Sequence, residues 1–244
     1  MGRALSEGLG AIEGFVVVAL VDLHPPTNLL QGAFVTSLDE LDASTVDVVV
    51  DFSSPDGVVT SATWCSAHGV DLVVGATGLS SSQRDLLRGA SATIGVVVAS
   101  NFSIGAVLAE HFAALAAPYF DGVEIIELHH DRKVDAPSGT SIAAARTIAA
   151  ARRAAGKSPL VDPTTRETIA GARGVDALDG VRIHSVRLPG LVAHEEIHFG
   201  GPGEGLTIRH DSFDRSSFVQ GVALAILALD STPRFLDGIG SLVG

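Results

Sequence analysis

Short apolar runs alternate with helix-like stretches through the N-terminal part of the chain. Runs rich in β-branched residues predict buried strands at 15–21, 46–52, 70–74 and 94–99. The stretches between them, such as 57–68 and 80–88, have the spacing of helices. This alternation predicts a parallel sheet built from βαβ units. Ligands of such sheets bind in the crevice beyond the carboxyl ends of the strands.

A different pattern follows after about residue 100. Helices are predicted at 104–117 and 140–155, with a strand between them at 123–129. Residues 157–180 have little periodicity and many turn-forming residues, so we predict a long loop there. The remainder predicts a second sheet and a closing helix, from segments 181–188, 191–199, 205–210 and about 217–229. The whole pattern is that of an α/β protein.

The beginning of the chain matches only part of the dinucleotide-binding pattern. That pattern opens with a strand, a glycine-rich turn and a helix, and an acidic residue ends the next strand about 20 residues later. Asp22 follows Gly2 at this spacing, so Gly2 takes the place of the last glycine of the turn. The first strand of this Rossmann-like sheet, which is central, has no counterpart in the sequence, and we expect its absence to divide the sheet. We hypothesise that translation starts upstream of Met1; an in-frame stop codon directly before Met1 would contradict this.

Composition and charge narrow the possible partners. The 244 residues carry a formal net charge of −12, which disfavours nucleic acid and anionic membranes. An anionic substrate would therefore need a local cluster of cations. The longest apolar run is too short to span a bilayer and no secretory signal is recognisable, so we expect the protein in the cytoplasm. The single cysteine, Cys65, suits a reducing compartment and is expected to be a buried core residue.

The strongest chemical signal is the segment 127–140, ELHHDRKVDAPSGT, which we interpret as a binding site for a small dicarboxylate. A strand delivers His129 and His130 at its carboxyl end, and histidine exchanges protons near neutral pH. Lys133 supplies a fixed cation or a second proton donor. Ser138-Gly139-Thr140 opens the next helix, whose first N–H groups bind carboxylate oxygens, and its two hydroxyls add donors.

Polar residues at the ends of the N-terminal strands are weaker candidates. Gly75-Ala76-Thr77-Gly78 and Ser100-Asn101-Phe102-Ser103 could line a cofactor crevice, or could be ordinary turns between strand and helix. Asp22 could accept hydrogen bonds from a ribose hydroxyl, or could be a solvated carboxylate. The sequence around these residues leaves both interpretations open.

The segment His194-Glu195-Glu196-Ile197-His198 matches the H-E-x-x-H motif of zinc peptidases in its letters. That motif requires a helix, whereas the alternation of residues here favours a strand, with its histidines roughly 13 Å apart. Because zinc ligands bind at about 2 Å, we expect a surface or interface strand and no metal site. Arg173, Arg187 and Arg209 could each meet an anionic substrate, or could be solvated.

The segment 127–140 resembles the signature of the 4-hydroxy-tetrahydrodipicolinate reductase (dihydrodipicolinate reductase) family of the diaminopimelate route to lysine. The resemblance covers nearly the whole chain and includes 51–55, 75–78, 100–103 and 171–174. It implies a dinucleotide-binding domain formed by 1–100 and 211–244. It also implies an α+β substrate-binding and oligomerisation domain with a mixed open sheet at 101–210, and a homotetramer assembled through these sheets.

The resemblance further implies NAD(P)H-dependent reduction of 4-hydroxy-tetrahydrodipicolinate to tetrahydrodipicolinate. By match to the family, His129 would be the proton donor or acceptor and Lys133 the proton donor. The substrate would be bound by His130, Ser138, Gly139 and Thr140, and NADH or NADPH by Asp22, Gly75, Ala76, Thr77, Ser100, Asn101 and Phe102.

Three features depart from the family pattern. Because the first strand and most of the glycine turn are missing from the sequence, a cofactor-deficient subunit or fragment is the alternative to an active reductase. A zinc hydrolase is a remote alternative. Ala76 stands where the family usually has Thr. Leu23 follows Asp22 where some members have Arg, so the 2′-phosphate of NADPH lacks a cation to pair with. We therefore predict that NADH is used at least as well as NADPH.

Overall fold

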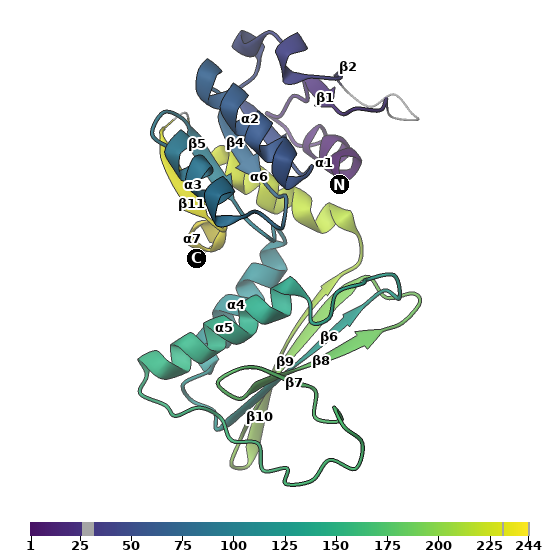
Figure 1. Cartoon of the computed structure of the whole chain (residues 1–244), viewed down its shortest axis with the longest axis vertical. Helices are drawn as coiled ribbons and strands as arrows, with labels where there is room; N and C mark the ends of the chain where they lie inside the picture. Colours follow the sequence, from purple (N-terminus) through teal and green to yellow (C-terminus); the bar gives the residue numbers. More distant parts are fainter. Residues whose placement is uncertain (26–31, 231, 244) are drawn as a thin grey trace. The chain divides into compact units, whose positions relative to one another are not determined.

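The computed structural model describes residues 1–25, 32–230 and 232–243. The chain forms two compact units (Figure 1). The first unit comprises Met1–Ile104 with Arg215–Gly244, and the second unit comprises Gly105–Asp214.

All strands of the first unit pair in parallel, but the described residues form two separate sheets. One sheet pairs β1 (Ala19–Val21) with β2 (Ala33–Val35), and the other has the order β11-β5-β4-β3. The strands of the second sheet are β3 (Val48–Asp51), β4 (Asp71–Val74), β5 (Gly95–Val98) and β11 (Arg234–Asp237). The sequence predicts this division of the sheet, between the strand at 15–21 and the strand at 46–52.

Helices cover both faces of the four-stranded sheet. α2 (Pro55–His68) and α3 (Ser81–Ala90) lie on one face, and α6 (Val219–Leu227) lies on the other (Figure 1). α1 (Gly2–Leu9) packs against α6, where a Cβ on Gly8 would come within 2.4 Å of a methyl carbon of Val219. The remaining elements are short: η1 (Leu38–Glu40), η2 (Ala43–Thr45), η3 (Arg215–Phe218) and α7 (Gly240–Val243).

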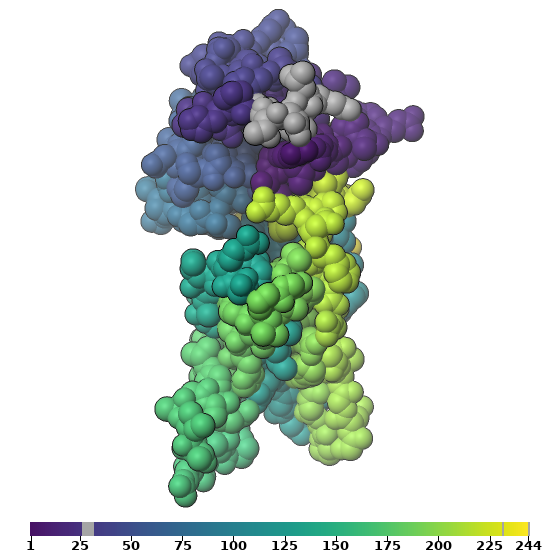
Figure 2. Space-filling view, turned by 90° about the vertical axis from the view of Figure 1, so that its right-hand side faces the viewer, coloured from purple at the N-terminus to yellow at the C-terminus, as the bar shows by residue number. Residues whose placement is uncertain are grey.

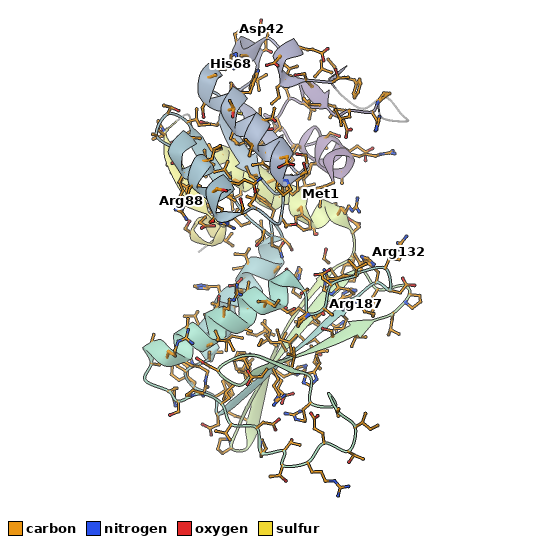
Figure 3. All side chains as sticks on the ribbon, viewed as in Figure 1. Met1, Asp42, His68, Arg88, Arg132 and Arg187 are labelled. Carbon is orange, nitrogen blue, oxygen red and sulfur yellow. The ribbon has the colours of Figure 1, made fainter. Side chains whose placement is uncertain are left out.

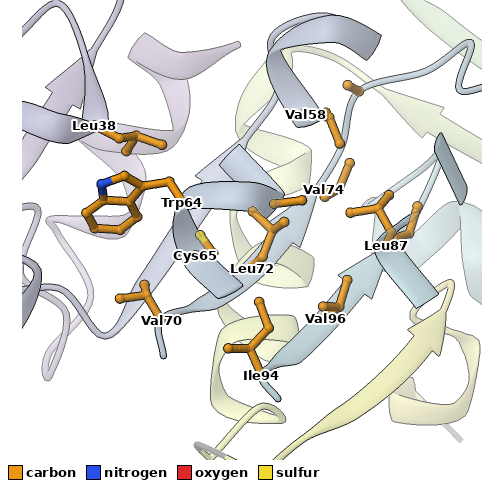
Figure 4. Close-up of a cluster of buried hydrophobic side chains, with 13 residues drawn as sticks. Leu38, Val58, Trp64, Cys65, Val70, Leu72, Val74, Leu87, Ile94 and Val96 are labelled. Atoms are coloured by element: carbon orange, nitrogen blue, oxygen red, sulfur yellow. The ribbon is translucent and has the colours of Figure 1, made fainter. Parts of the chain in front are cut away.

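The core of the first unit lies between this sheet and helices α2 and α3 (Figure 4). β4 and β5 are buried along their whole length, which explains their continuous apolar sequences. Leu72 and Val96 from these strands pack in one cluster with Trp64 and Cys65 of α2. Cys65 is fully buried, as predicted, and burial together with two nearby aspartates raises the pKa of its thiol to about 12. This thiol is therefore a core group and not a nucleophile.

Two sequence predictions for the first unit need correction. The strand predicted at 15–21 forms only at Ala19–Val21, and Val16 is 83 % exposed. The sequence also does not predict β2 or β11, which are short and lack a long apolar run. Both become strands because a neighbouring strand offers an edge, since β2 pairs with β1 and β11 pairs with β5.

The second unit is a five-stranded mixed sheet with two helices on one face (Figure 1). The strand order is β10-β9-β6-β8-β7; β6 and β8 pair in parallel and the other neighbours are antiparallel. The strands are β6 (Gly122–His129), β7 (Val175–Leu178), β8 (Val181–Arg187), β9 (Ala193–Gly201) and β10 (Glu204–Ser212). The helices are α4 (Ile104–Ala116) and α5 (Gly139–Ala154). The predicted mixed sheet is thus confirmed.

The loop predicted at 157–180 is shorter than expected. Its last part forms β7, which pairs with β8, so the described loop without helix or strand covers 157–174. This loop is the green arm beside the sheet in Figures 1 and 2.

Side chains of β6 alternate between the two faces of the sheet. Val123, Ile125 and Glu127 are buried on the face that carries α4 and α5, which we call the helix-covered face. Glu124 and Ile126 lie on the opposite face, which we call the open face. Among the described residues, no helix is both long and apolar enough to cross a membrane.

Candidate active site

The segment 127–140 joins the end of β6 to the start of α5 within the second unit. β6 ends at His129, and α5 begins at Gly139 after the N-cap residue Ser138. Arg132 of the connecting loop and Arg187 at the end of β8 lie at the same end of this unit (Figure 3). The strand end and the helix start that the sequence predicts are therefore both present.

Glu127 is wholly buried and joins two cationic side chains. Its carboxylate accepts two hydrogen bonds from Arg187, at 2.8 and 2.9 Å, and one from Nδ1 of His129. Burial opposes ionisation, but these bonds and one from Ser185 together lower the pKa of Glu127 to about 2. Arg187 also donates to the carbonyl oxygen of Asp135 at 2.7 Å, so one guanidinium ties the loop to the strand.

The charge of Glu127 fixes the proton arrangement of His129. An ionised carboxylate can only accept hydrogen bonds, so Nδ1 of His129 carries the hydrogen that faces Glu127. Nε2 is then the ring atom that exchanges protons with its surroundings. The His129 side chain is 14 % exposed, which gives the ring limited contact with solvent.

Lys133 and His130 lie in the same loop. Nζ of Lys133 donates to both carboxylate oxygens of Asp135, at 2.8 and 2.9 Å, and this lowers the pKa of Asp135. Nδ1 of His130 is buried and has no hydrogen-bond partner among the residues that the structure describes. A buried polar atom without a partner costs stability and is typical of a site shaped for something other than folding.

The start of α5 offers backbone N–H groups at a positive helix end. Gly139 is exposed, and a Cβ on it would meet no described atom within 4 Å. Thr140 is half-buried, whereas Ser138 is only 3 % exposed. Oγ of Ser138 accepts from the N–H of Ser141 at 3.2 Å and lies 2.8 Å from Oγ of Ser141. The side chain of Ser138 therefore caps the helix from inside the protein.

The cofactor candidates of the first unit follow the carboxyl ends of parallel strands. Residues 75–77 follow β4 and residues 100–102 follow β5, while Asp22 follows β1. Thr77 and Ser100 are exposed, and each offers a hydroxyl there. Such strand ends are the usual place of ligand binding in parallel sheets.

Other candidates at these strand ends face the core. Phe102 is fully buried against Phe52, with ring centroids 5.4 Å apart, and Ala76 is also buried. Gly75 lies so close to Phe52 that a Cβ would come within 2.1 Å of its ring. Phe102 and Ala76 can therefore offer a ligand mainly their backbone atoms, and Gly75 is required by packing.

Comparison with known proteins decides the family. Residues 1–102 match the family model "Dihydrodipicolinate reductase, N-terminus", and residues 105–239 match "Dihydrodipicolinate reductase, C-terminus". The chain belongs to the dihydrodipicolinate reductase family.

Individual relatives agree with this assignment. The 4-hydroxy-tetrahydrodipicolinate reductase of Cutibacterium acnes is 44 % identical over 247 residues, which cover 100 % of this chain and 94 % of that protein. The enzyme of the same name from Nocardia farcinica is 45 % identical over 242 residues, covering 98 % and 92 %. The dipicolinate-bound dihydrodipicolinate reductase from Paenisporosarcina sp. TG-14 superposes with a TM-score of 0.84 at 37 % identity, covering 98 % and 94 %.

The three arginines considered from the sequence differ in this fold. Arg187 belongs to the motif through Glu127, whereas Arg173 bonds Glu124 on the open face. Arg209 bonds Glu196 and Asp211. Each is paired with a carboxylate, so none is simply solvated.

The segment 194–198 lies in strand β9, as the alternation predicts. His194 bonds Asp211 at 2.7 Å and His198 bonds Glu196 at 2.8 Å. In the described part of the chain, no group of three His, Cys, Asp or Glu residues could hold a metal ion. The sequence leads us to expect a surface or interface strand; one face of this strand is covered, because Glu195 is buried on the helix-covered face.

Sequence reasoning missed Glu127 and Glu195 as supporting residues of the site, and it named Arg187 only as one of three arginines that could meet an anion. Glu127 could have been found, because it precedes His129 by two positions and so shares its face of the strand. The places of Arg187 and Glu195 could not have been found, because strand register alone puts Arg187 beside His129 and Glu195 beside Glu127.

Proposed function

We propose that the protein reduces 4-hydroxy-tetrahydrodipicolinate to tetrahydrodipicolinate with a reduced pyridine nucleotide. The observation that carries this proposal is the arrangement around α5 of the second unit. An acid–base histidine held by Glu127, a lysine and the exposed helix start at Gly139 come from one continuous segment. A relative of this fold is described as dipicolinate-bound, and dipicolinate is a planar cyclic dicarboxylate.

In this proposal the second unit binds the substrate and handles its proton. The carboxylates are bound by Lys133, His130 and the N–H groups of Gly139 and Thr140, because cations and helix starts both attract anions. His129 donates or accepts a proton at Nε2, since Nδ1 is engaged with Glu127. Ser138 contributes as the inward cap that shapes this helix start.

The first unit binds the nucleotide in this proposal, and the bound nucleotide supplies the hydride. Backbone and hydroxyl groups of 75–77 and 100–102 would contact it at the ends of β4 and β5. The carboxylate of Asp22 would accept a hydrogen bond from a ribose hydroxyl. It is exposed, and a carboxylate oxygen already accepts from the N–H of His24 at 3.1 Å. These residues fit a nucleotide because their exposed polar groups are at the carboxyl ends of parallel strands.

The reductase activity is tested by following nucleotide oxidation with 4-hydroxy-tetrahydrodipicolinate and the purified protein. We expect turnover, and a loss of kcat by about 100-fold or more in His129→Gln and Lys133→Met, in line with general acid–base catalysis. Lys157→Met is the matched control, because Lys157 is an exposed lysine just beyond α5. Wild-type activity that both site variants retain would contradict the proposal.

The nucleotide preference is tested by titrating NADH and NADPH separately. Leu23 beside Asp22 is 79 % exposed and offers no charge to a 2′-phosphate. We therefore expect NADH to have a kcat/KM at least equal to that of NADPH. A strong preference for NADPH contradicts this, and binding of neither nucleotide supports the cofactor-deficient subunit instead.

We further propose a cytoplasmic homotetramer assembled through the open face of the five-stranded sheet. The support is that, among the described residues, α4 and α5 cover only the other face of this sheet. Light scattering of the purified protein tests this proposal, with a monomeric mass as the contradicting result.

A further inference from the structure

The helix-covered face of the sheet holds a second buried carboxyl group that the proposed chemistry does not use. Glu195 of β9 is 9 % exposed and lies directly opposite Glu127 of β6 in the antiparallel register. Side chains opposed in this way have Cβ atoms about 5 Å apart, so two ionised carboxylates here would repel each other. Glu127 is held ionised by Arg187 and His129.

The surroundings of Glu195 raise its pKa above the ordinary value of a glutamate. Burial raises the pKa of Glu195, and the charges of Glu110 on α4 and Glu127 on β6 raise it further. The hydrogen bond from Ser141 and the charge of His129 act in the opposite direction but do not prevail. Two carboxyl groups side by side thus have opposite shifts of pKa.

A chain of hydroxyl groups leads from Glu195 to the start of α5. Oγ of Ser141 donates to a carboxyl oxygen of Glu195, and it lies 2.8 Å from Oγ of Ser138. Ser138 is the N-cap of α5 and directly precedes the exposed Gly139. All three side chains of this chain are at least nine-tenths buried, so water does not replace these bonds.

We propose that Glu195 is a positioning residue, which acts through Ser141 to orient the hydroxyl of Ser138 toward the anion site at the start of α5. This inference rests on the proposed function, because it assigns a carboxylate of the dicarboxylate substrate to that site. When Glu195 carries its proton, it donates to Ser141, and Ser141 donates to Ser138. The hydroxyl hydrogen of Ser138 is then left for an anion at the helix start.

Loss of that proton reverses the chain. An ionised Glu195 only accepts, so Ser141 donates to it and the hydroxyl of Ser138 turns inward to Ser141. An inward hydroxyl presents its oxygen, and not its hydrogen, to the substrate carboxylate. The relay therefore links substrate affinity to the proton on Glu195, and affinity falls as pH rises through the titration of this group.

The test compares Ser141→Ala and Glu195→Gln with the wild type over a range of pH. We expect Ser141→Ala to raise KM for the dicarboxylate about 3- to 10-fold, as for loss of one hydrogen bond, with KM for the nucleotide unchanged. Glu195→Gln should stay within about twofold of wild type at the acidic end of the range, where Glu195 carries its proton, because the amide N–H₂ can still donate to Ser141. It should also lack the rise of KM with increasing pH that the wild type shows, because an amide does not ionise.

Glu196→Gln is the matched control, because Glu196 is the next residue of β9 and faces the open side with Arg209. Dipicolinate binding measured by calorimetry gives a readout that does not need turnover, and thermal unfolding shows whether each variant is folded. An unchanged KM in Ser141→Ala overturns the relay, and so does a Glu195→Gln variant as impaired as Ser141→Ala. A wild type that neither turns over nor binds dipicolinate overturns the proposed function itself.

Discussion

Strand β6 carries two glutamates that each bond one arginine and one histidine, on opposite faces of the same sheet. Glu127 bonds Arg187 and His129 on the helix-covered face, and Glu124 bonds Arg173 and His184 on the open face. The side chain of Glu127 is 0 % exposed and that of Glu124 is 35 % exposed. The same residue types thus make a buried cluster and a partly solvated one.

The comparison shows that burial, and not the set of residues, gives such a cluster its strength. In the single chain, water and salt screen the charges around Glu124, whereas the charges around Glu127 interact in a medium of low polarity. A buried charge also becomes costly as soon as its partner is removed. The same substitution should therefore have a larger effect in the buried cluster around Glu127 than in the cluster around Glu124, in every measurement.

The largest difference should follow removal of each arginine. Arg187→Leu leaves the carboxylate of Glu127 buried without its arginine, with only His129 and Ser185 as partners, and we expect a loss of about 3–5 kcal/mol in the free energy of unfolding. Arg173→Leu should cost about 1 kcal/mol or less, because water can solvate Glu124. Urea unfolding at neutral pH measures both, and equal losses would refute the contrast.

Stability should also depend on pH more strongly through Glu127. Its pKa is about 2 in the folded protein against an ordinary value of 4.5, so its contribution is complete above pH 4.5 and is lost as pH falls toward 2. The shift corresponds to a loss on the order of 3 kcal/mol. The pKa of Glu124 is lowered too, but solvent screening makes its contribution smaller.

Unfolding curves measured from pH 6 to pH 2.5 should show this difference on the acid side. In Glu127→Gln the decline in stability with falling pH should be markedly flatter than in the wild type. Glu124→Gln should follow the wild type closely. If only Glu124→Gln had a flatter decline in stability, Glu124 and not Glu127 would be the main source of the pH dependence.

The kcat of Glu127→Gln should be about tenfold lower than that of Glu124→Gln. Glu127→Gln removes the anion that holds the Nδ1 hydrogen of His129, and the neutral amide can also donate to the ring and so stabilise the wrong tautomer. Glu124→Gln, on the open face, should keep kcat within about twofold. Steady-state assays with both substrates saturating test this, and an unimpaired Glu127→Gln would remove Glu127 from the positioning of His129.

The smallest expected effect is that of salt. The stability of wild type and Glu124→Gln should differ by less than about 1 kcal/mol at low salt. Raising the salt to about 1 M should remove most of this difference. The difference for Glu127→Gln should persist, because ions do not reach a wholly buried carboxylate. Parallel urea titrations at low and high salt measure both.

Much of the molecule follows from local sequence. The β-branched runs at 46–52, 70–74 and 94–99 predict β3, β4 and β5 because buried parallel strands need apolar residues on both faces. Segment 127–140 predicts a strand, a loop and a helix start with acid–base groups, because each of these features depends on neighbouring residues. The alternation in 194–198 likewise identifies a strand and not a helix.

Tertiary structure alone decides what those residues do. The sequence could not place Arg187 beside Glu127, since 60 positions separate them and the parallel register of β6 and β8 brings them together. It could not show that Glu195 is buried opposite Glu127, because either face of β9 could have met the helices. Pairing partners, strand register and the covered face are properties of the assembled sheet, and they turn a histidine motif into a site with one fixed proton arrangement.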